Sequence, residues 1–232
     1  LKIAVSIACV ITALIYPCSQ VIAAYSGPPR TAIPNTLYTG TTVVSDPLIS
    51  NHLGWQARPT SKSSCTFTDA GYEVLAGDAN NPQACFTDKT NFSDFALQVE
   101  MTLEKGAVGG ILFRDRYLLV LIGNPYTTGN FDLYVYMRNG DRANLTPSCD
   151  PLQLQTGCPI GESVAPQQTV TVTIVAIGTS IELYVDTHKV QTLTNGVSLT
   201  GKIGVFAEIA NGQPDAQTGV LCANMRVWTN VA

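Results

Sequence analysis

Hydrophobic and polar residues alternate along much of the chain between Asp94 and Asp186. In FALQVEMTL, residues 95–103, every second residue from Phe95 to Leu103 is large and apolar. A period of two puts one face of a strand into a core and the other face toward water, whereas a helix needs a period near 3.6. The pattern therefore predicts a β-strand with one buried face.

The same alternation returns in several later segments, with turn residues between them. We predict further strands over 108–116, 117–123, 131–137, 169–177 and 180–186. The side chains expected to point into the core include Phe131, Leu133, Val135, Met137, Ile181, Leu183 and Val185. Short alternating strands separated by turns are typical of an all-β antiparallel β-sandwich, which is the predicted fold class.

The first 24 residues differ from the rest. A lysine, an apolar run and then small residues give residues 1–24 the layout of a secretory signal peptide, cleaved after Ala23 or Ala24. If this segment is retained, it is a membrane anchor, a pilin-like helix or a β-strand donated to a neighbouring subunit. Every alternative predicts export to the cell surface or beyond.

Residues 25–45 are rich in proline and threonine and lack any clear periodicity. This composition predicts an extended linker. We therefore expect three parts: the apolar segment 1–24, the linker 25–45 and a compact domain over 46–232.

Several segments of the compact domain carry a resemblance to a known family. They are DPL…GW (46–55), CTFTDAGYEV (65–74), GGILFR (109–114), LYVYM (133–137), IELYVD (181–186), GKIGVFA (201–207) and NMRVW (224–228). Together they resemble the concanavalin A-like lectin/glucanase superfamily, in particular its laminin-G-like and 3-keto-disaccharide hydrolase-type extracellular jelly rolls from bacteria. The resemblance implies a jelly-roll sandwich and, since Arg114 ends GGILFR, a place for Arg114 in the family's cleft.

Charge and composition narrow the choice of partners. Charged residues make up 13% of the chain, the net charge is -4 and the pI is about 5.1. Without a basic patch to neutralise a phosphate backbone, nucleic acid is not an expected partner. Only two histidines are present and no cysteine belongs to a CxxC pair, so we expect no metal site and no cofactor.

Seven cysteines in a chain of this kind favour disulfide bonds. We pair Cys65 with Cys85 and Cys149 with Cys158, because each pair brackets a short segment. Cys222 is then left with Cys9 and Cys18. If residues 1–24 stay on the mature protein, Cys18 is its more plausible partner, because it lies past the apolar run. A buried free thiol is the equal alternative.

Two sequons, Asn91-Phe92-Ser93 and Asn144-Leu145-Thr146, predict N-linked glycan on Asn91 and Asn144 if the secretory route supplies it.

Glucanases of the family space acidic residues at every second position of one strand, so that a nucleophile and an acid share a cleft. The comparable strand here carries only Glu100 and Glu104, four residues apart. Asp115 lies between two arginines, a setting that lowers the pKa of a carboxyl group and suits a salt bridge. We therefore predict no catalytic residues and no enzymatic activity.

The sequence supports a ligand-binding face better than it supports a catalytic site. The residues that alternate with the core positions include tyrosines beside charged side chains: Asp132, Tyr134, Tyr136, Glu182 and Tyr184. Tyrosine rings can stack on sugar rings while the polar groups bond to sugar hydroxyls. The alternative is that tyrosine is simply a good strand former on a solvated face.

Three functions follow, in order of preference. The first is a structural subunit that binds copies of itself through residues 1–24 to form an extracellular, pilus-like filament. The second is a secreted carbohydrate-binding module that uses the tyrosine face. The third is a glycan hydrolase whose catalytic groups the sequence does not reveal, for which Glu100 would be the first residue to test.

Overall fold

The computed structural model describes residues 40–59, 63–77, 82–105, 108–123, 129–146, 158–161, 164–209 and 218–231. The apolar segment 1–24, and with it the choice between a cleaved and a retained N-terminus, lies outside the described residues.

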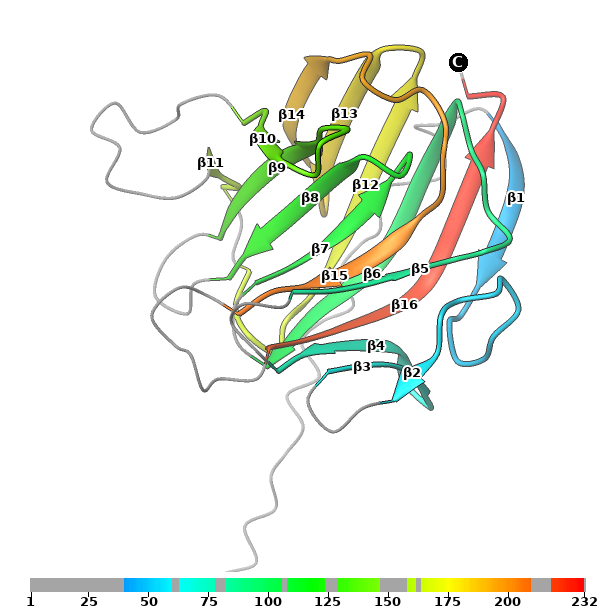
Figure 1. Ribbon diagram of the computed structural model, residues 1–232, viewed down its shortest axis with the longest axis vertical. Helices are drawn as coiled ribbons and strands as arrows, with labels where there is room; N and C mark the ends of the chain where they lie inside the picture. The colour runs from blue at the N-terminus through cyan, green and yellow to red at the C-terminus, as the bar shows by residue number, and fades with distance from the viewer. Residues whose placement is uncertain are drawn as a thin grey trace, which may run out of the picture.

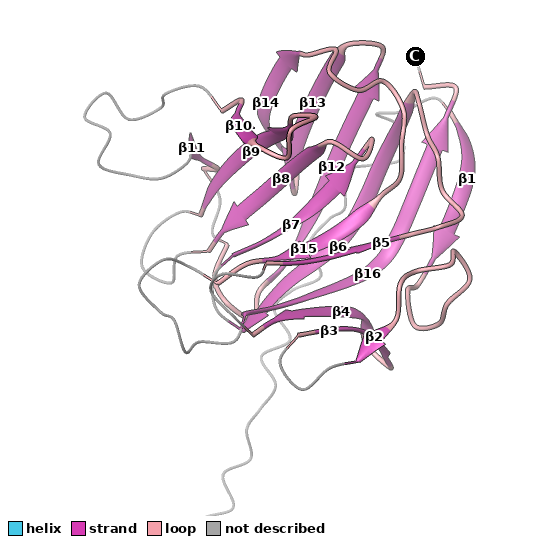
Figure 2. Ribbon diagram, in the orientation of Figure 1, coloured by secondary structure: helices cyan, strands magenta, loops and turns pink. Residues whose placement is uncertain are grey.

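Within the described residues, the chain forms two antiparallel β-sheets stacked face to face, and no helix (Figures 1 and 2). The nine-stranded sheet has the order β14-β13-β12-β6-β16-β4-β3-β2, with β1 paired to β16. Its strands are β1 Thr41–Asp46, β2 Arg58–Pro59, β3 Ser64–Thr68, β4 Gly71–Ala76, β6 Phe95–Lys105, β12 Thr169–Ile177, β13 Ser180–Val185, β14 His188–Thr194 and β16 Thr218–Thr229.

The seven-stranded sheet has the order β10-β9-β8-β7-β15-β5, with β11 paired to β9. Its strands are β5 Gln83–Phe86, β7 Val108–Phe113, β8 Tyr117–Ile122, β9 Asn130–Tyr136, β10 Arg142–Asn144, β11 Cys158–Pro159 and β15 Gly204–Ala207. The predicted all-β antiparallel sandwich is confirmed. In this described part, no helix is present that could cross a bilayer.

The hydrophobic core lies between the sheets and is built from the alternating positions. Every second residue of β6, from Phe95 to Leu103, is at most 2% exposed and faces the other sheet. Burying such a side chain contributes about 1.5–3 kcal/mol relative to leaving it in water. β6 pairs with β12 on one side and β16 on the other, so this strand is central to the nine-stranded sheet.

Glycine permits a close approach of the two sheets at Gly109. A Cβ atom there would lie 2.1 Å from a side-chain carbon of Val220 and 2.8 Å from one of Leu103. Both of these residues belong to the nine-stranded sheet, on β16 and β6. A side chain at the Gly109-Gly110 pair would therefore prevent this tight packing of the sheets.

Three boundaries differ from the sequence prediction. β1 begins at Thr41, inside the segment read as linker, because residues 41–46 pair with the end of β16. Met137 is 43% exposed and follows β9, so it does not continue the inward series as expected. The chain between residues 137 and 169, for which the alternation predicts no strand, contains the short strands β10 and β11.

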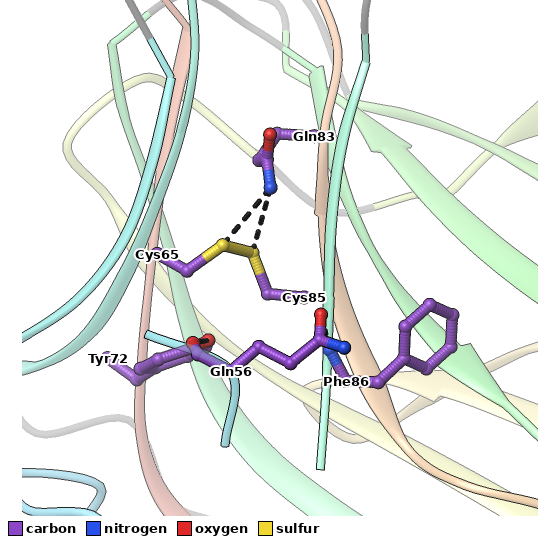
Figure 3. The surroundings of a disulfide bond; sticks show 6 residues. All are labelled: Gln56, Cys65, Tyr72, Gln83, Cys85 and Phe86. Atoms are coloured by element: carbon purple, nitrogen blue, oxygen red, sulfur yellow. Dashed lines mark hydrogen bonds between the residues drawn. A yellow bond between two sulfur atoms is a disulfide. The ribbon is translucent and has the colours of Figure 1, made fainter. Parts of the chain in front are cut away.

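The predicted Cys65–Cys85 disulfide is confirmed, and it joins the two sheets rather than closing a hairpin. Cys65 lies on β3 of the nine-stranded sheet and Cys85 on β5 of the seven-stranded sheet (Figure 3). The amide of Gln83 points at the bridge, with its Nε2 atom 3.1 Å from Cys65 Sγ and 3.4 Å from Cys85 Sγ. Both cysteines are fully buried.

The other two described cysteines, Cys158 and Cys222, differ in their bonding. Cys158 is disulfide-bonded and its partner lies outside the described residues, so its pairing with Cys149 stays a prediction. Cys222 is a free thiol, which confirms the second alternative for this cysteine and rules out its pairing with Cys18. The reason is its position: Cys222 faces the core from β16 and is 0% exposed. Burial raises the pKa of its thiol to about 12, which keeps it protonated.

Candidate functional site

Three of the predicted binding residues share the outer face of the seven-stranded sheet. On β9, Phe131, Leu133 and Val135 belong to the core between the sheets. Because successive side chains of a strand point to opposite faces, Asp132, Tyr134 and Tyr136 point away from that core. The sequence prediction for this strand therefore holds up to Tyr136, where β9 ends.

Asp132 is the centre of a hydrogen-bond network on this face. Its Oδ2 atom accepts a hydrogen bond of 3.1 Å from the Tyr134 hydroxyl. Its Oδ1 atom accepts another of 3.1 Å from Asn144 Nδ2 on the neighbouring strand β10. Asp132 is only 3% exposed, and both of these partners are neutral donors. Burial, with the charge of Asp132 beside it, raises the pKa of Tyr134 to about 12, so its hydroxyl stays a donor at neutral pH.

Arg142, also on β10, covers the ring of Tyr134. The guanidinium carbon of Arg142 lies 4.5 Å from the centroid of that ring, a cation–π geometry. Arg142 Nη1 also donates a hydrogen bond of 3.2 Å to Glu208 Oε2. The guanidinium therefore has an aromatic partner on β9 and an anionic partner that directly follows β15.

The Arg142–Glu208 contact also indicates that this face is curved. β10 and β15 are separated in the sheet by β9, β8 and β7. Neighbouring strands lie about 4.8 Å apart, so β10 and β15 would be about 19 Å apart in a flat sheet. Two side chains cannot bridge such a gap and still leave 3.2 Å between nitrogen and oxygen. The sheet therefore curves toward its outer face.

Apolar side chains form the rest of this curved face. One cluster of them comes from β7, β8 and β15, and each member is at most 8% exposed: Val108, Leu112, Leu118, Val120 and Phe206. Tyr134 and Tyr136 pack against this cluster. We call the polar side chains at its border the binding surface: Asp132, Tyr134, Tyr136, Arg142, Asn144 and Glu208. Aromatic rings beside fixed donors and acceptors are what sugar recognition requires.

Glu182 and Tyr184 lie on the opposite side of the molecule. They point outward from β13 of the nine-stranded sheet, because Ile181, Leu183 and Val185 face the core. There the Tyr184 hydroxyl donates a hydrogen bond of 2.6 Å to Glu182 Oε2. This hydrogen bond is the main reason that the pKa of Glu182 is lowered. The structure thus separates the two tyrosine groups that the sequence prediction combined.

Arg114 is not on the binding surface either. It lies in the turn between β7 and β8 and is 0% exposed. Its Nη1 atom donates to the carbonyl oxygen of Gly178 at 2.8 Å, and its Nε atom donates to that of Ser93 at 2.9 Å. Arg114 therefore connects three turns inside the protein, and none of these hydrogen bonds involves the curved face.

The two glutamates considered for catalysis are on β6 of the nine-stranded sheet. Glu100 points outward, since Val99 and Met101 are in the core, and it accepts a hydrogen bond of 2.8 Å from Asn224 Nδ2. It is therefore remote from the binding surface. The described residues contain no group of three or more His, Cys, Asp or Glu side chains arranged to hold a metal ion.

Both sequon asparagines are exposed. Asn91 Oδ1 accepts a hydrogen bond of 2.8 Å from Thr200 Oγ1. Asn144 belongs to the binding surface, so glycan attached to its Nδ2 atom would compete with any ligand there. Modification of either residue stays a prediction.

The sequence did not predict Arg142 or Glu208 as site residues, and it predicted Asn144 only as a glycosylation site. Arg142 and Asn144 belong to a three-residue edge strand, which is too short to show a period. Glu208 follows β15 and reaches Arg142 only through the curvature of the sheet. No signal within the sequence pairs these two residues.

Comparison with known proteins identifies the fold. No protein-family model and no curated sequence matches the chain significantly. Among solved structures, the carbohydrate-binding module CBM66 from Bacillus subtilis has a TM-score of 0.56 at 16% identity and covers 79% of this chain and 100% of that one. The β-glucanase of Bacillus licheniformis has a TM-score of 0.53 at 14% identity, over 83% and 99%.

A Bacillus subtilis protein with a galectin-like fold is similar as well, with a TM-score of 0.51 at 11% identity over 82% of this chain and 97% of that one. These likenesses show the concanavalin A-like jelly-roll fold that the sequence resemblance predicted. At such low identities they carry the fold alone. The function must be argued from the binding surface.

Proposed function

We propose that this protein is a secreted carbohydrate-binding module that holds a glycan on the binding surface of the seven-stranded sheet. The observation that carries the proposal is the network around Asp132. Its carboxylate accepts hydrogen bonds from Tyr134 and Asn144, and Arg142 lies over the Tyr134 ring. A buried, oriented carboxylate beside stacked aromatic and cationic groups is preorganised for sugar hydroxyls.

The fold and the disulfide support the same proposal. The similar structures include a carbohydrate-binding module and a β-glucanase. The Cys65–Cys85 bridge is typical of proteins that fold in an oxidising compartment, which agrees with an extracellular location. Neither the described residues nor the comparisons support the filament subunit that ranked first on sequence, and its key segment 1–24 lies outside the described part of the chain.

Binding is favoured over hydrolysis by the placement of the acidic residues. Hydrolysis of a glycosidic bond uses two carboxyl groups on either side of the bond. On the binding surface, Glu208 is paired with Arg142 and Asp132 accepts from two neutral donors. Both carboxylates are therefore engaged by side chains of the protein itself, whereas hydrolysis would need one of them to donate a proton to the glycosidic oxygen.

The proposal is tested by measuring glycan affinity in the intact protein by calorimetry, after an array has identified an oligosaccharide that binds. Tyr136→Ala and Tyr134→Ala should each weaken binding by about tenfold or more, because aromatic side chains dominate such contacts. Tyr184→Ala is the matched control: it removes a tyrosine from the outer face of the other sheet and should leave the affinity unchanged.

Two results would refute the proposal. One is the absence of saturable binding to every glycan on the array. The other is an equal loss of affinity in Tyr184→Ala and Tyr136→Ala, which would place the ligand elsewhere. Circular dichroism and a thermal melt of each variant exclude unfolding as the cause.

A further inference from the structure

The charges of the binding surface differ in how they are compensated. Arg142 is the one cation among its six residues, and Glu208 and Asp132 are the two anions. Arg142 and Glu208 neutralise each other through their 3.2 Å contact. Asp132 accepts only from the Tyr134 hydroxyl and the Asn144 amide among its described hydrogen bonds, and both donors are neutral. The surface therefore carries one negative charge in excess.

We propose that Glu208 is a specificity-determining residue, which restricts the binding surface to uncharged glycans by occupying Arg142. The inference rests on the proposed function and names the class of ligand for that same surface.

Arginine is the residue that most often recognises carboxylate and sulfate groups, since its planar guanidinium offers paired donors. Here one of those donors is already occupied. Nη1 of Arg142 is bonded to Glu208, and the guanidinium plane is held over the ring of Tyr134. An acidic sugar would have to displace Glu208 from Arg142 while approaching two carboxylates of its own sign. When two such groups are in contact near a protein surface, the repulsion between their like charges is strong.

A neutral sugar meets no such obstacle. Its hydroxyl groups can donate to the carboxylate of Glu208, whose side chain is 28% exposed, without displacing either arginine contact. Its ring carbons can cover the exposed parts of Tyr134 and Tyr136, which are only partly buried. The same six residues that exclude an anion therefore suit an uncharged pyranose or furanose.

The position of Glu208 explains why one residue has this effect. It directly follows β15, whereas Arg142 lies on the edge strand β10, with β9, β8 and β7 between the two strands. Among the described residues, Glu208 is the anionic side chain that contacts Arg142. Replacing Glu208 by glutamine removes the charge, keeps the size and leaves the guanidinium open to a ligand carboxylate.

The test compares the full chain with its Glu208→Gln variant on two sets of oligosaccharides of equal length. One set contains neutral oligomers of glucose, galactose, mannose and fructose; the other contains alginate and polygalacturonate oligomers. The wild-type protein should bind a neutral oligomer at least about tenfold more tightly than any uronate. Glu208→Gln should gain about tenfold or more for a uronate oligomer, and the gain should shrink as NaCl rises from about 50 mM to about 500 mM.

Two variants make the result specific. Glu182→Gln is the matched control, since Glu182 also forms an exposed ion pair, with Lys189 at 2.9 Å, on the opposite sheet. It removes one negative charge as well but should bring no gain for uronates. Arg142→Gln combined with Glu208→Gln should abolish the gain, because the gain acts through the freed guanidinium.

Equal wild-type affinity for uronates and neutral oligomers overturns the inference and leaves the proposed function standing. An equal gain in Glu182→Gln and Glu208→Gln also overturns it, because net charge alone would then be responsible. Failure of the wild-type protein to bind either set, or any other glycan on the array, refutes the proposed function itself, so the two failures are distinguishable.

Discussion

The outer faces of the two sheets carry the same three kinds of residue and use them differently. On β9, an acid and a tyrosine two residues apart, Asp132 and Tyr134, lie beside Arg142 of the edge strand β10. On β13, Glu182 and Tyr184 repeat that spacing beside Lys189 of the edge strand β14. In both places the tyrosine hydroxyl donates to the acid.

The acids differ in burial and the cations in their partners. Asp132 is 3% exposed, whereas the side chain of Glu182 is 30% exposed. Lys189 closes an ion pair with Glu182 itself, and no residue from a distant strand is needed. Arg142 instead pairs with Glu208 from beyond three intervening strands. The nine-stranded face has a local ion pair, and the seven-stranded face has a network that spans its curvature.

This difference explains why we assign function to one face only. A local, half-exposed ion pair contributes about 0–1 kcal/mol and orders little around it. A buried carboxylate held by two donors beside an apolar cluster is a rigid recognition element. The sequence pattern is nearly the same on both strands, so the surroundings of the acid, rather than the residue types, distinguish the two faces.

The largest effect is expected from removing the link between the turns of the two sheets. Arg114 of the β7–β8 turn donates to Gly178 of the β12–β13 turn and to Ser93 before β6. Arg114→Ala should lower the free energy of unfolding by about 3–5 kcal/mol, because it removes a fully buried side chain with its hydrogen bonds to two carbonyl groups and opens a cavity.

Urea denaturation followed by tryptophan fluorescence measures this loss. Arg116→Ala, in the same turn but partly exposed, is the matched control and should cost less than about 1.5 kcal/mol through its bond to Tyr136. Equal losses in the two variants would contradict the role assigned to Arg114.

A smaller effect is expected from separating the sheets at the disulfide. The double variant Cys65→Ala/Cys85→Ala should lose about 3 kcal/mol of stability, since the bridge closes a loop of moderate length in the unfolded chain. A guanidinium chloride titration measures it, with the single variant Cys222→Ala as a control that removes a buried thiol and no bridge. A double variant as stable as the control would show that the bridge is dispensable.

The smallest effect directly contrasts the two tyrosines. Burial holds the pKa of Tyr134 at about 12 in the folded state, above its usual value of 10.0. The folded protein therefore keeps a proton that the unfolded chain loses, so stability is complete below about pH 10 and falls as the pH rises toward 12. The slope from this one group is at most about 1.4 kcal/mol per pH unit, and solvent screening reduces it.

Tyr134→Phe should flatten this alkaline loss of stability, as measured by urea unfolding at about pH 9 and about pH 11. Tyr184→Phe should flatten it less, because the pKa of Tyr184 is also raised by burial but by a smaller amount. An equal change in both variants would mean that folding raises the pKa of Tyr134 and of Tyr184 to the same extent.

Much of the fold could be predicted from the sequence because strand periodicity is a local property. The alternation from Phe95 to Leu103 identified β6 and its buried face, and a disulfide between Cys65 and Cys85 followed from their spacing. The strands that the alternation did not predict include β1, β10 and β11. Two of these have three residues or fewer, and β1 depends on pairing with the distant β16.

The candidate site was predicted only in part. Asp132, Tyr134 and Tyr136 were found because they alternate with core residues on one strand. Glu182 and Tyr184 were grouped with them because alternation tells which way a side chain points from its own sheet and not which sheet that is. Arg114 was added through a motif, and its burial among carbonyl groups became visible only in the structure.

The sequence by itself determined that this is an antiparallel sandwich, which residues of the predicted strands enter the core, apart from Met137, and that aromatic and acidic side chains line an outer face. These properties depend on neighbours one or two residues apart. The tertiary structure decided that β9 and β13 belong to different sheets, that Arg142 and Glu208 meet, and that Cys222 stays unpaired. Those depend on strand order and sheet curvature, which arise from contacts between residues far apart in the chain.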